Sequence, residues 1–165
     1  MKATKILFVI LTLFLYSCEY FMLGLTIRAD KRTFEKERNL WNKQNLKNYK
    51  FTYKYFHDAG PIGPVKIMVT ENEGSIIIEN PYDDYFILKT IPEIYDYISE
   101  TFDYIESVKN GKDDGHEIRD ITLDIFYDAK YHYPTKVHLS TGYVQDIDGG
   151  AYYTLEITNF STLQQ

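Results

Sequence analysis

Residues 118–139, IRDITLDIFYDAKYHYPTKVHL, contain the clearest strand pattern in the chain and decide how its fold is interpreted. Apolar and polar residues alternate on both sides of a short break, and a period of two is typical of strands with one buried face. The break ends at Tyr133-Pro134, where proline fixes its own φ, lacks an amide proton and disfavours a helical conformation at the tyrosine. We therefore predict two strands joined by a turn.

Composition favours a single folded domain that does not bind nucleic acid. The chain has 165 residues, which is enough to bury a core without a metal or disulfides. Its formal net charge is −6, and a negative field repels phosphate backbones. The sixteen tyrosines fit a sheet that buries one aromatic face. We expect one domain with no cofactor and no nucleic-acid partner.

The first residues have the layout of an export signal. Lys2 and Lys5 precede an apolar run that ends shortly before Cys18. An apolar residue three places before a cysteine and a small residue one place before it resemble the bacterial lipobox, and Leu15 and Ser17 stand at these places. By that resemblance, Cys18 is acylated with a lipid such as palmitate and becomes the first mature residue.

This interpretation predicts both the segments of the chain and its location in the cell. Cys18 is the sole cysteine, so the mature domain has no disulfide. We expect a lipoprotein that is anchored to a membrane of the bacterial cell envelope and faces away from the cytoplasm. Residues 1–17 are then the signal peptide, residues 18–39 a tether and the start of the first helix, and residues 40–162 a single domain.

Two alternatives to the lipid anchor stay open. Residues 6–27 are long enough to cross a bilayer of roughly 30 Å as an uncleaved anchor. Glu19 lies inside that span, and a carboxylate near mid-membrane costs about 2.5 kcal/mol or more. Against the lipobox, residues 20–23, YFML, are more apolar than the usual start of a lipoprotein tether. An ordinary cleaved signal peptide is the other alternative.

Periodicity predicts a helix and three strands before the middle of the chain. Residues 29–48 are highly charged and keep Phe34, Trp41 and Asn45 on nearly one helical face. From Tyr49 the period changes to two, which indicates a strand. Residues 57–64, HDAGPIGP, contain two glycines and two prolines and predict a loop. Two further strands are expected at residues 65–69 and 75–79.

A second helix is the most distinct local prediction. Thr90-Ile91-Pro92-Glu93 combines a capping box with proline in the first turn. Short turns favour antiparallel neighbours, so we predict an α+β fold with a single antiparallel sheet of about six strands and two helices, in the order α-β-β-β-α-β-β-β. The expected core-facing stripe of the second helix consists of Ile91, Ile94, Tyr95, Ile98, Phe102, Ile105 and Val108.

Several short patterns carry a resemblance to a known family. They are, in chain order, Trp41, Asn45-x-x-x-Tyr49-x-Phe51-x-Tyr53, Gly63-Pro64-Val65-x-Ile67, Thr90-Ile91-x-x-Ile94-Tyr95, Tyr127-Asp128 with Tyr133-Pro134, and residues 153–160. On these residues the chain resembles an uncharacterised family of bacterial exported and lipoprotein-type domains of unknown function, over roughly residues 40–160. Many members carry two cysteines where this chain has Phe56 and His57. The resemblance implies a fold and an envelope location but no activity.

Tyrosines in loops and at strand ends are the candidate binding residues. Amphipathic aromatic side chains on rigid edges are what protein and glycan recognition surfaces use. Packing in the core and at sheet edges explains such tyrosines equally well. The candidates are Tyr131, Tyr133, Tyr143 and Tyr152, with Tyr82 and Tyr85 in an earlier connection.

Other polar groups give weaker signals. His132 and His138 flank the central turn and could meet with Asp128 as a metal site. Residues 146–150, DIDGG, resemble part of a calcium loop but lack its third ligand and terminal glutamate. On the second helix, Asp96, Glu100 and Asp103 form either a solvated face or a surface for a basic partner. We predict no metal site.

The sequence therefore favours a binding or structural module over an enzyme. It contains no G-x-S-x-G elbow and no phosphate-cradling glycine loop, and we predict no catalytic residue. We expect a non-enzymatic envelope domain whose partner is an unknown protein, peptide or glycan. The alternative is an envelope hydrolase or an enzyme inhibitor. A closed pocket with convergent acids or histidines favours the enzyme, whereas a shallow face rimmed by tyrosines favours binding.

Overall fold

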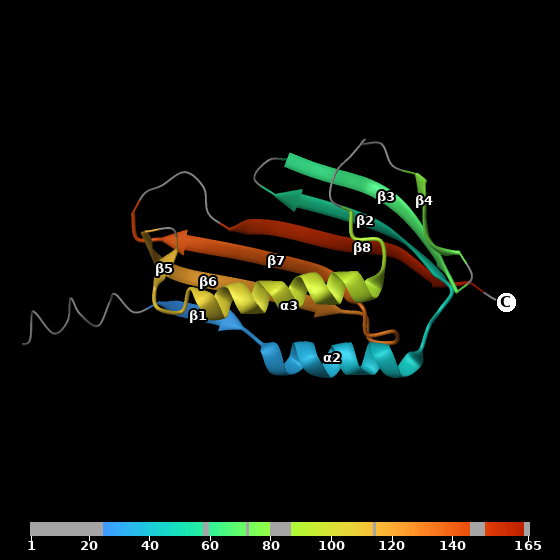
Figure 1. Cartoon of the computed structure of the whole chain (residues 1–165), viewed down its shortest axis with the longest axis horizontal. Coiled ribbons are helices and arrows are strands. Elements are labelled where there is room, and N and C mark those ends of the chain that lie inside the picture. Colours follow the sequence, from blue (N-terminus) through green and yellow to red (C-terminus); the bar gives the residue numbers. More distant parts are fainter. Residues whose placement is uncertain are drawn as a thin grey trace, which may run out of the picture.

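The structure is a computed structural model that describes residues 25–57, 60–71, 73–79, 87–113, 115–145 and 151–163. The predicted signal peptide, Cys18, Tyr82, Tyr85 and residues 146–150 lie outside the described residues. Within those residues, two helices pack on one mixed sheet (Figure 1). The elements are β1 (Thr26–Ala29), α2 (Lys31–Gln44), β2 (Tyr49–His57), β3 (Gly60–Thr70), β4 (Gly74–Glu79), α3 (Ile91–Ser107), β5 (Lys112–Asp113), β6 (His116–Tyr127), β7 (Pro134–Tyr143) and β8 (Tyr152–Thr162).

The sheet is mixed, with the strand order β1-β6-β7-β8-β2-β3-β4, and the short β5 pairs with β6. Its neighbouring strands are antiparallel, except that β1 runs parallel to β6 from Thr26↔Asp120 to Ala29↔Leu123. The predicted α+β class is confirmed. The single sheet is also confirmed, and the six predicted strands correspond to β2, β3, β4, β6, β7 and β8. The prediction that the sheet is purely antiparallel is wrong, because β1 is parallel to β6, and β1 and β5 are additional strands. These strands are too short to show a pattern of their own and are defined by their pairing with β6.

The central hairpin forms as predicted from β6 and β7, which pair Leu123 with Leu139 and Ile125 with Val137. Its turn is organised by Asp128, whose Oδ1 accepts hydrogen bonds from the amides of Lys130 at 2.9 Å and Tyr131 at 2.7 Å. A side chain that accepts from amides two and three residues later is a common turn device. It satisfies two backbone amides that lie beyond the end of β6.

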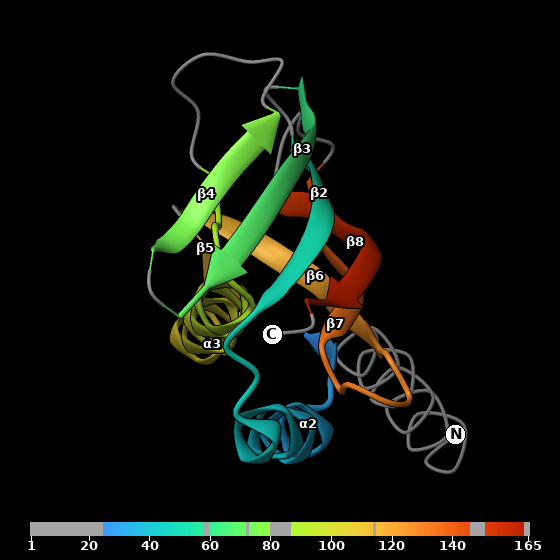
Figure 2. The ribbon, with the colours of Figure 1, turned by 90° about the vertical axis from the view of Figure 1, so that its right-hand side faces the viewer.

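Both helices lie on one side of the curved sheet (Figure 2). The start of α3 is capped by Thr90, whose hydroxyl accepts from the amide of Glu93 at 3.2 Å, and every residue of its predicted apolar stripe is buried. Helix α2 buries Phe34 and Trp41 as expected. It is shorter than the predicted 29–48, because Asn45 adopts a left-handed conformation at φ 50° that ends the helix.

The predicted loop at residues 57–64 is largely wrong, because β3 begins at Gly60. Prolines are tolerated there because β4 pairs with β3 only from Lys66 onward, so the first half of β3 pairs with β2 alone. The pairing shifts by one residue between Tyr53 and Tyr55, which marks a bulge in β3. Gly63 lies in this bulge at φ +103°, and a Cβ there would lie 2.6 Å from the carbonyl oxygen of Tyr53.

Candidate binding face

One face of the sheet is covered by no described helix, and we call it the helix-free face (Figure 2). Strand alternation decides which side chains it presents: Tyr55, Leu139 and Tyr153 point into the core, so their neighbours point outward. The strand registers place these neighbours in rows. The longest row crosses five strands and consists of Pro61, Phe56, Thr154, His138 and Asp124.

Three aromatic side chains gather on this face and form the aromatic cluster, Phe56, His138 and Tyr152. The ring centroids of Phe56 and Tyr152 are 5.9 Å apart, and those of His138 and Tyr152 are 5.4 Å apart, both in edge-to-face arrangements. The Nδ1 atom of His138 lies 3.0 Å from the hydroxyl of Thr154, which holds the imidazole in place. Phe56 is 45 % exposed and Tyr152 38 %. Grouped exposed aromatics of this kind mark interaction surfaces.

The row beside the aromatic cluster contains two lysines and one glutamate, and one of the lysines is paired with the glutamate. Lys136 Nζ lies 3.0 Å from Glu156 Oε1, and Lys54 is opposite the same glutamate on the other side. Both members of the ion pair are partly exposed, so it contributes at most about 1 kcal/mol to stability. Phe126, opposite Lys136, ends the row with 57 % of its surface exposed. The face therefore combines aromatic rings with one ion pair and a further lysine.

A groove of about 230 Å³ lies on the same face where β2, β3, β4 and β8 meet. Asn159 has a left-handed backbone at φ 54°, and its amide nitrogen donates to the hydroxyl of Thr52 at 3.3 Å. Lys66 Nζ lies 2.5 Å from Glu79 Oε2. We call this feature the lysine groove, and it is lined by Lys50, Phe51, Thr52, Lys66, Ile67, Ile78 and Asn159.

The four tyrosines predicted as a binding surface occupy three separate places. Tyr131 and Tyr133 come together, because both rings contact Phe160, at centroid distances of 5.2 Å and 4.4 Å, and Tyr133 is buried. Tyr143 lies elsewhere, and its hydroxyl donates to Asp113 at 3.0 Å. Only Tyr152 lies in the aromatic cluster. Its partners Phe56 and His138 were not among the predicted binding residues, although their outward positions follow from strand alternation.

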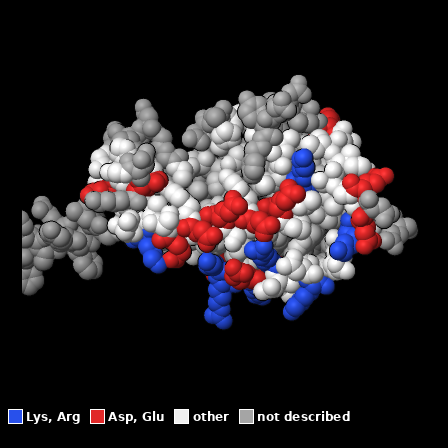
Figure 3. All heavy atoms as spheres, viewed as in Figure 1, with Lys and Arg blue, Asp and Glu red and all other residues white. Residues whose placement is uncertain are grey.

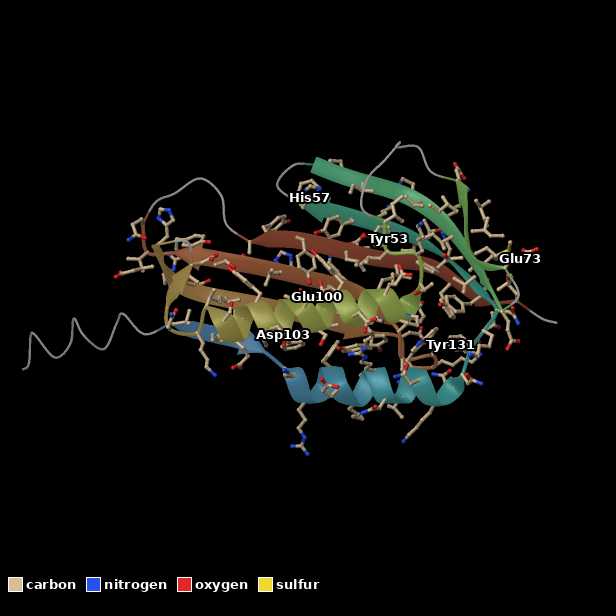
Figure 4. The ribbon with its side chains drawn as sticks, in the orientation of Figure 1. Tyr53, His57, Glu73, Glu100, Asp103 and Tyr131 are labelled. Carbon is tan, nitrogen blue, oxygen red and sulfur yellow. The ribbon has the colours of Figure 1, made fainter. Side chains whose placement is uncertain are left out.

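A second group of tyrosines packs in the core between α3 and the sheet. The hydroxyls of Tyr55 and Tyr97 are 2.8 Å apart, and that of Tyr153 is 2.8 Å from the hydroxyl of Thr101. The hydroxyl of Tyr53 is buried without a hydrogen-bond partner among the described residues (Figure 4). Burial raises the pKa values of Tyr53, Tyr55 and Tyr153 well above the usual tyrosine range, so these phenols stay neutral. This group supports packing.

The acidic row of α3 is on the opposite side of the molecule from the aromatic cluster. Glu100 and Asp103 are exposed on α3 (Figure 4), and acidic side chains form a band across this side (Figure 3). Asp96 forms an ion pair with Arg38 of α2. One member of the row thus meets a basic group of the same chain.

His132 and His138 lie apart and do not form the suggested metal site. His138 belongs to the aromatic cluster, whereas the Nδ1 atom of His132 lies 2.7 Å from Glu37 Oε2 on α2. Among the described residues, no group of three histidine, cysteine, aspartate or glutamate side chains is placed to hold a metal ion.

Both helices hold the turn of the central hairpin, a feature that the sequence did not reveal. Besides the contact of Glu37 with His132, the Gln44 amide nitrogen donates to the carbonyl oxygen of Tyr131 at 2.8 Å. From α3, the hydroxyl of Tyr95 donates to the carbonyl oxygen of His132. Glu37 follows Phe34 by three residues on the buried side of α2, and this spacing was the only available signal.

The fold and the face define an α+β domain with helices on one side of a mixed sheet and an aromatic cluster exposed on the other. In the described part of the chain, neither helix has the length and apolar character needed to span a membrane. Residues 33–161 match a family model described as "Family of unknown function (DUF6174)", and the chain belongs to this family. The expected membership of an uncharacterised family is thereby confirmed. No curated protein and no solved structure matches the chain.

Proposed function

We propose that this chain is a non-catalytic binding domain of the bacterial envelope that recognises a protein, peptide or glycan partner through its helix-free face. The observation that carries the proposal is the aromatic cluster, in which Phe56 and Tyr152 are exposed side by side next to His138. Exposed rings fixed on rigid strands lose little side-chain freedom on binding, so they contribute strongly to recognition.

The use of the remaining polar groups also supports binding rather than catalysis. The contact between Glu37 and His132 joins an acid to a histidine, but the glutamate side chain is only 12 % exposed and the pair fixes a turn. Two grooves on the described surface have volumes of about 330 and 230 Å³, and their linings contain one acidic side chain and none, respectively, and no histidine. An envelope hydrolase or an enzyme inhibitor is the alternative, and an inhibitor would use the same exposed face.

The proposed anchor is a lipid on Cys18, which precedes β1 by seven residues of chain and would hold the domain near a bilayer. The test is incorporation of labelled palmitate into the full chain, with Cys18→Ala as the control. Label in the parent and none in Cys18→Ala supports the lipid anchor. Membrane retention of both proteins without label would instead indicate an uncleaved anchor.

The binding proposal is tested by capture of partners from detergent-solubilised membranes with the full chain, followed by rebinding of purified candidates. Phe56→Ser and Tyr152→Ser remove the exposed rings, and Val144→Ser removes an apolar side chain of similar exposure, 43 %, outside the aromatic cluster. A specific partner should bind the parent chain and Val144→Ser but lose about tenfold or more in affinity for the two ring variants. Equal binding by all four proteins would overturn the proposal.

A further inference from the structure

The lysine groove has a lining that suits an anion. Its charged side chains are Lys50 and Lys66, and its neutral polar side chains are Thr52 and Asn159. The Thr52 hydroxyl oxygen accepts a hydrogen bond from the side-chain amide of Asn159, so the hydroxyl proton can be donated to a further acceptor. Among the described residues, Lys50 has no ion-pair partner, and no carboxylate lines the groove.

Backbone geometry fixes the wall of the groove at Asn159. Asn159 has its left-handed φ of 54° where the pairing of β2 with β8 shifts register between Lys50 and Thr52. Asparagine adopts this conformation more readily than most residues, and here it accompanies the bulge and directs the side-chain amide to Thr52. Thr52, to which Asn159 donates, is only 7 % exposed although it lies on the helix-free face.

The remaining wall limits what can enter. Ile78 of β4 is apolar and 55 % exposed, and the alkyl stems of the two lysines add further apolar surface. A volume of about 230 Å³ is below that of a site for a drug-sized molecule. The groove therefore fits a small anionic group on a short apolar stem.

We propose that the lysine groove binds a carboxylate on a short apolar stem, which the partner presents as an acidic side chain. This inference rests on the proposed function and adds the charge of the partner to it. Lys50 and Phe56 both point outward from β2 and are six residues apart, which corresponds to about 20 Å of strand. A partner that covers the aromatic cluster and reaches the groove would be acidic at one end and apolar at the other.

Glu79 provides an internal competitor for the carboxylate. It is already paired with Lys66, so an incoming carboxylate has to share or displace it. Removing its charge in Glu79→Gln should therefore strengthen binding about two- to fivefold, the range expected for an exposed ion pair. A merely structural role of Lys66 and Glu79 predicts no such gain.

The experiment is a titration of the full chain in detergent, followed through the backbone amide resonances of Thr52 and Asn159. The probes are isovalerate, its neutral amide isovaleramide, and inorganic phosphate. Isovalerate should bind to the parent chain, and Lys50→Ala and Lys66→Ala should weaken it about tenfold because each loses a charge-assisted hydrogen bond. Lys54→Ala, which removes an exposed lysine of the same strand outside the groove, should bind like the parent.

Three results would overturn the inference: equal binding of isovaleramide and isovalerate, binding of phosphate without isovalerate, or equal weakening by Lys54→Ala. The ring variants described above separate this outcome from the proposed function. If they abolish partner binding while the groove variants do not, the face is a binding surface and only the carboxylate site is wrong.

Discussion

The Nδ1 atom of His132 lies 2.7 Å from Oε2 of Glu37, and this contact joins the turn of the central hairpin to the first helix. Both side chains are largely removed from solvent, with 26 % and 12 % of their surfaces exposed. His132 also has a left-handed φ of 61°, and its carbonyl oxygen accepts a hydrogen bond from the hydroxyl of Tyr95 on α3. The turn is therefore a junction where both helices meet the sheet.

Removal of the Glu37 side chain should destabilise the domain. In Glu37→Ala the ring of His132 loses its partner in a largely buried position, and we expect the free energy of unfolding to fall by about 1–3 kcal/mol. Urea unfolding measures this loss. Glu35→Ala is the matched control, because Glu35 is exposed on the same helix and its removal should change stability by less than about 0.5 kcal/mol. Equal losses in both variants would contradict the junction.

Gly63→Ala should be much more destabilising than Gly60→Ala. Both glycines have positive φ values, +103° and +119°, so alanine is strained at either position. A Cβ at Gly60 meets nothing within 4 Å, whereas one at Gly63 lies 2.6 Å from the carbonyl oxygen of Tyr53. We expect Gly60→Ala to lose about 1–2 kcal/mol and Gly63→Ala clearly more. Similar urea midpoints for the two variants would show that β3 moves away without cost.

Alkaline solution should destabilise the domain. Burial raises the pKa of Tyr49 and of Tyr133 to about 12, whereas an unfolded tyrosine has a pKa of about 10. Between these values the unfolded chain loses protons that the folded chain keeps, so stability is fully present below pH 10 and falls as the pH rises toward 12. Urea midpoints measured against pH, with tyrosinate absorbance, follow this fall. In Tyr133→Phe the fall should be shallower, and an unchanged slope would refute the assignment.

The exposed aromatic rings should matter for binding but little for stability. Phe56 and Tyr152 lie on the helix-free face, so Phe56→Ser and Tyr152→Ser should each change the free energy of unfolding by about 1 kcal/mol or less. Thermal unfolding of the same preparations used for partner capture checks this expectation. A large loss of stability would mean that the rings are part of the core, and the capture experiment would then report misfolding.

Local signals in the sequence predicted most elements correctly. The alternation in β6 and β7, the capping residues before α3 and the change of period at Tyr49 depend on neighbouring residues, and the structure confirms them. The strand that contains Gly63 and Pro64 depends on pairing with β2, and it was mispredicted. The end of α2 at Asn45 was also mispredicted, although asparagine is a common left-handed residue at the end of a helix.

The candidate site was harder to predict because it is assembled across strands. Phe56, Thr154 and His138 form one row only because β8 lies between β2 and β7, and no pattern within a strand specifies that order. Tyr152 was recognised by its residue type, whereas Phe56 and His138 were not. Asn159 and Thr52 likewise meet across a bulge that the sequence does not mark.

The position of β8 has a consequence for the nascent chain. This last strand is inserted between β2 and β7 and supplies the link between the two halves of the sheet. Pairings this distant in sequence form slowly, since a long loop must close first. Until β8 has been synthesised, β2 and β7 lack the strand that lies between them, so the sheet cannot be completed.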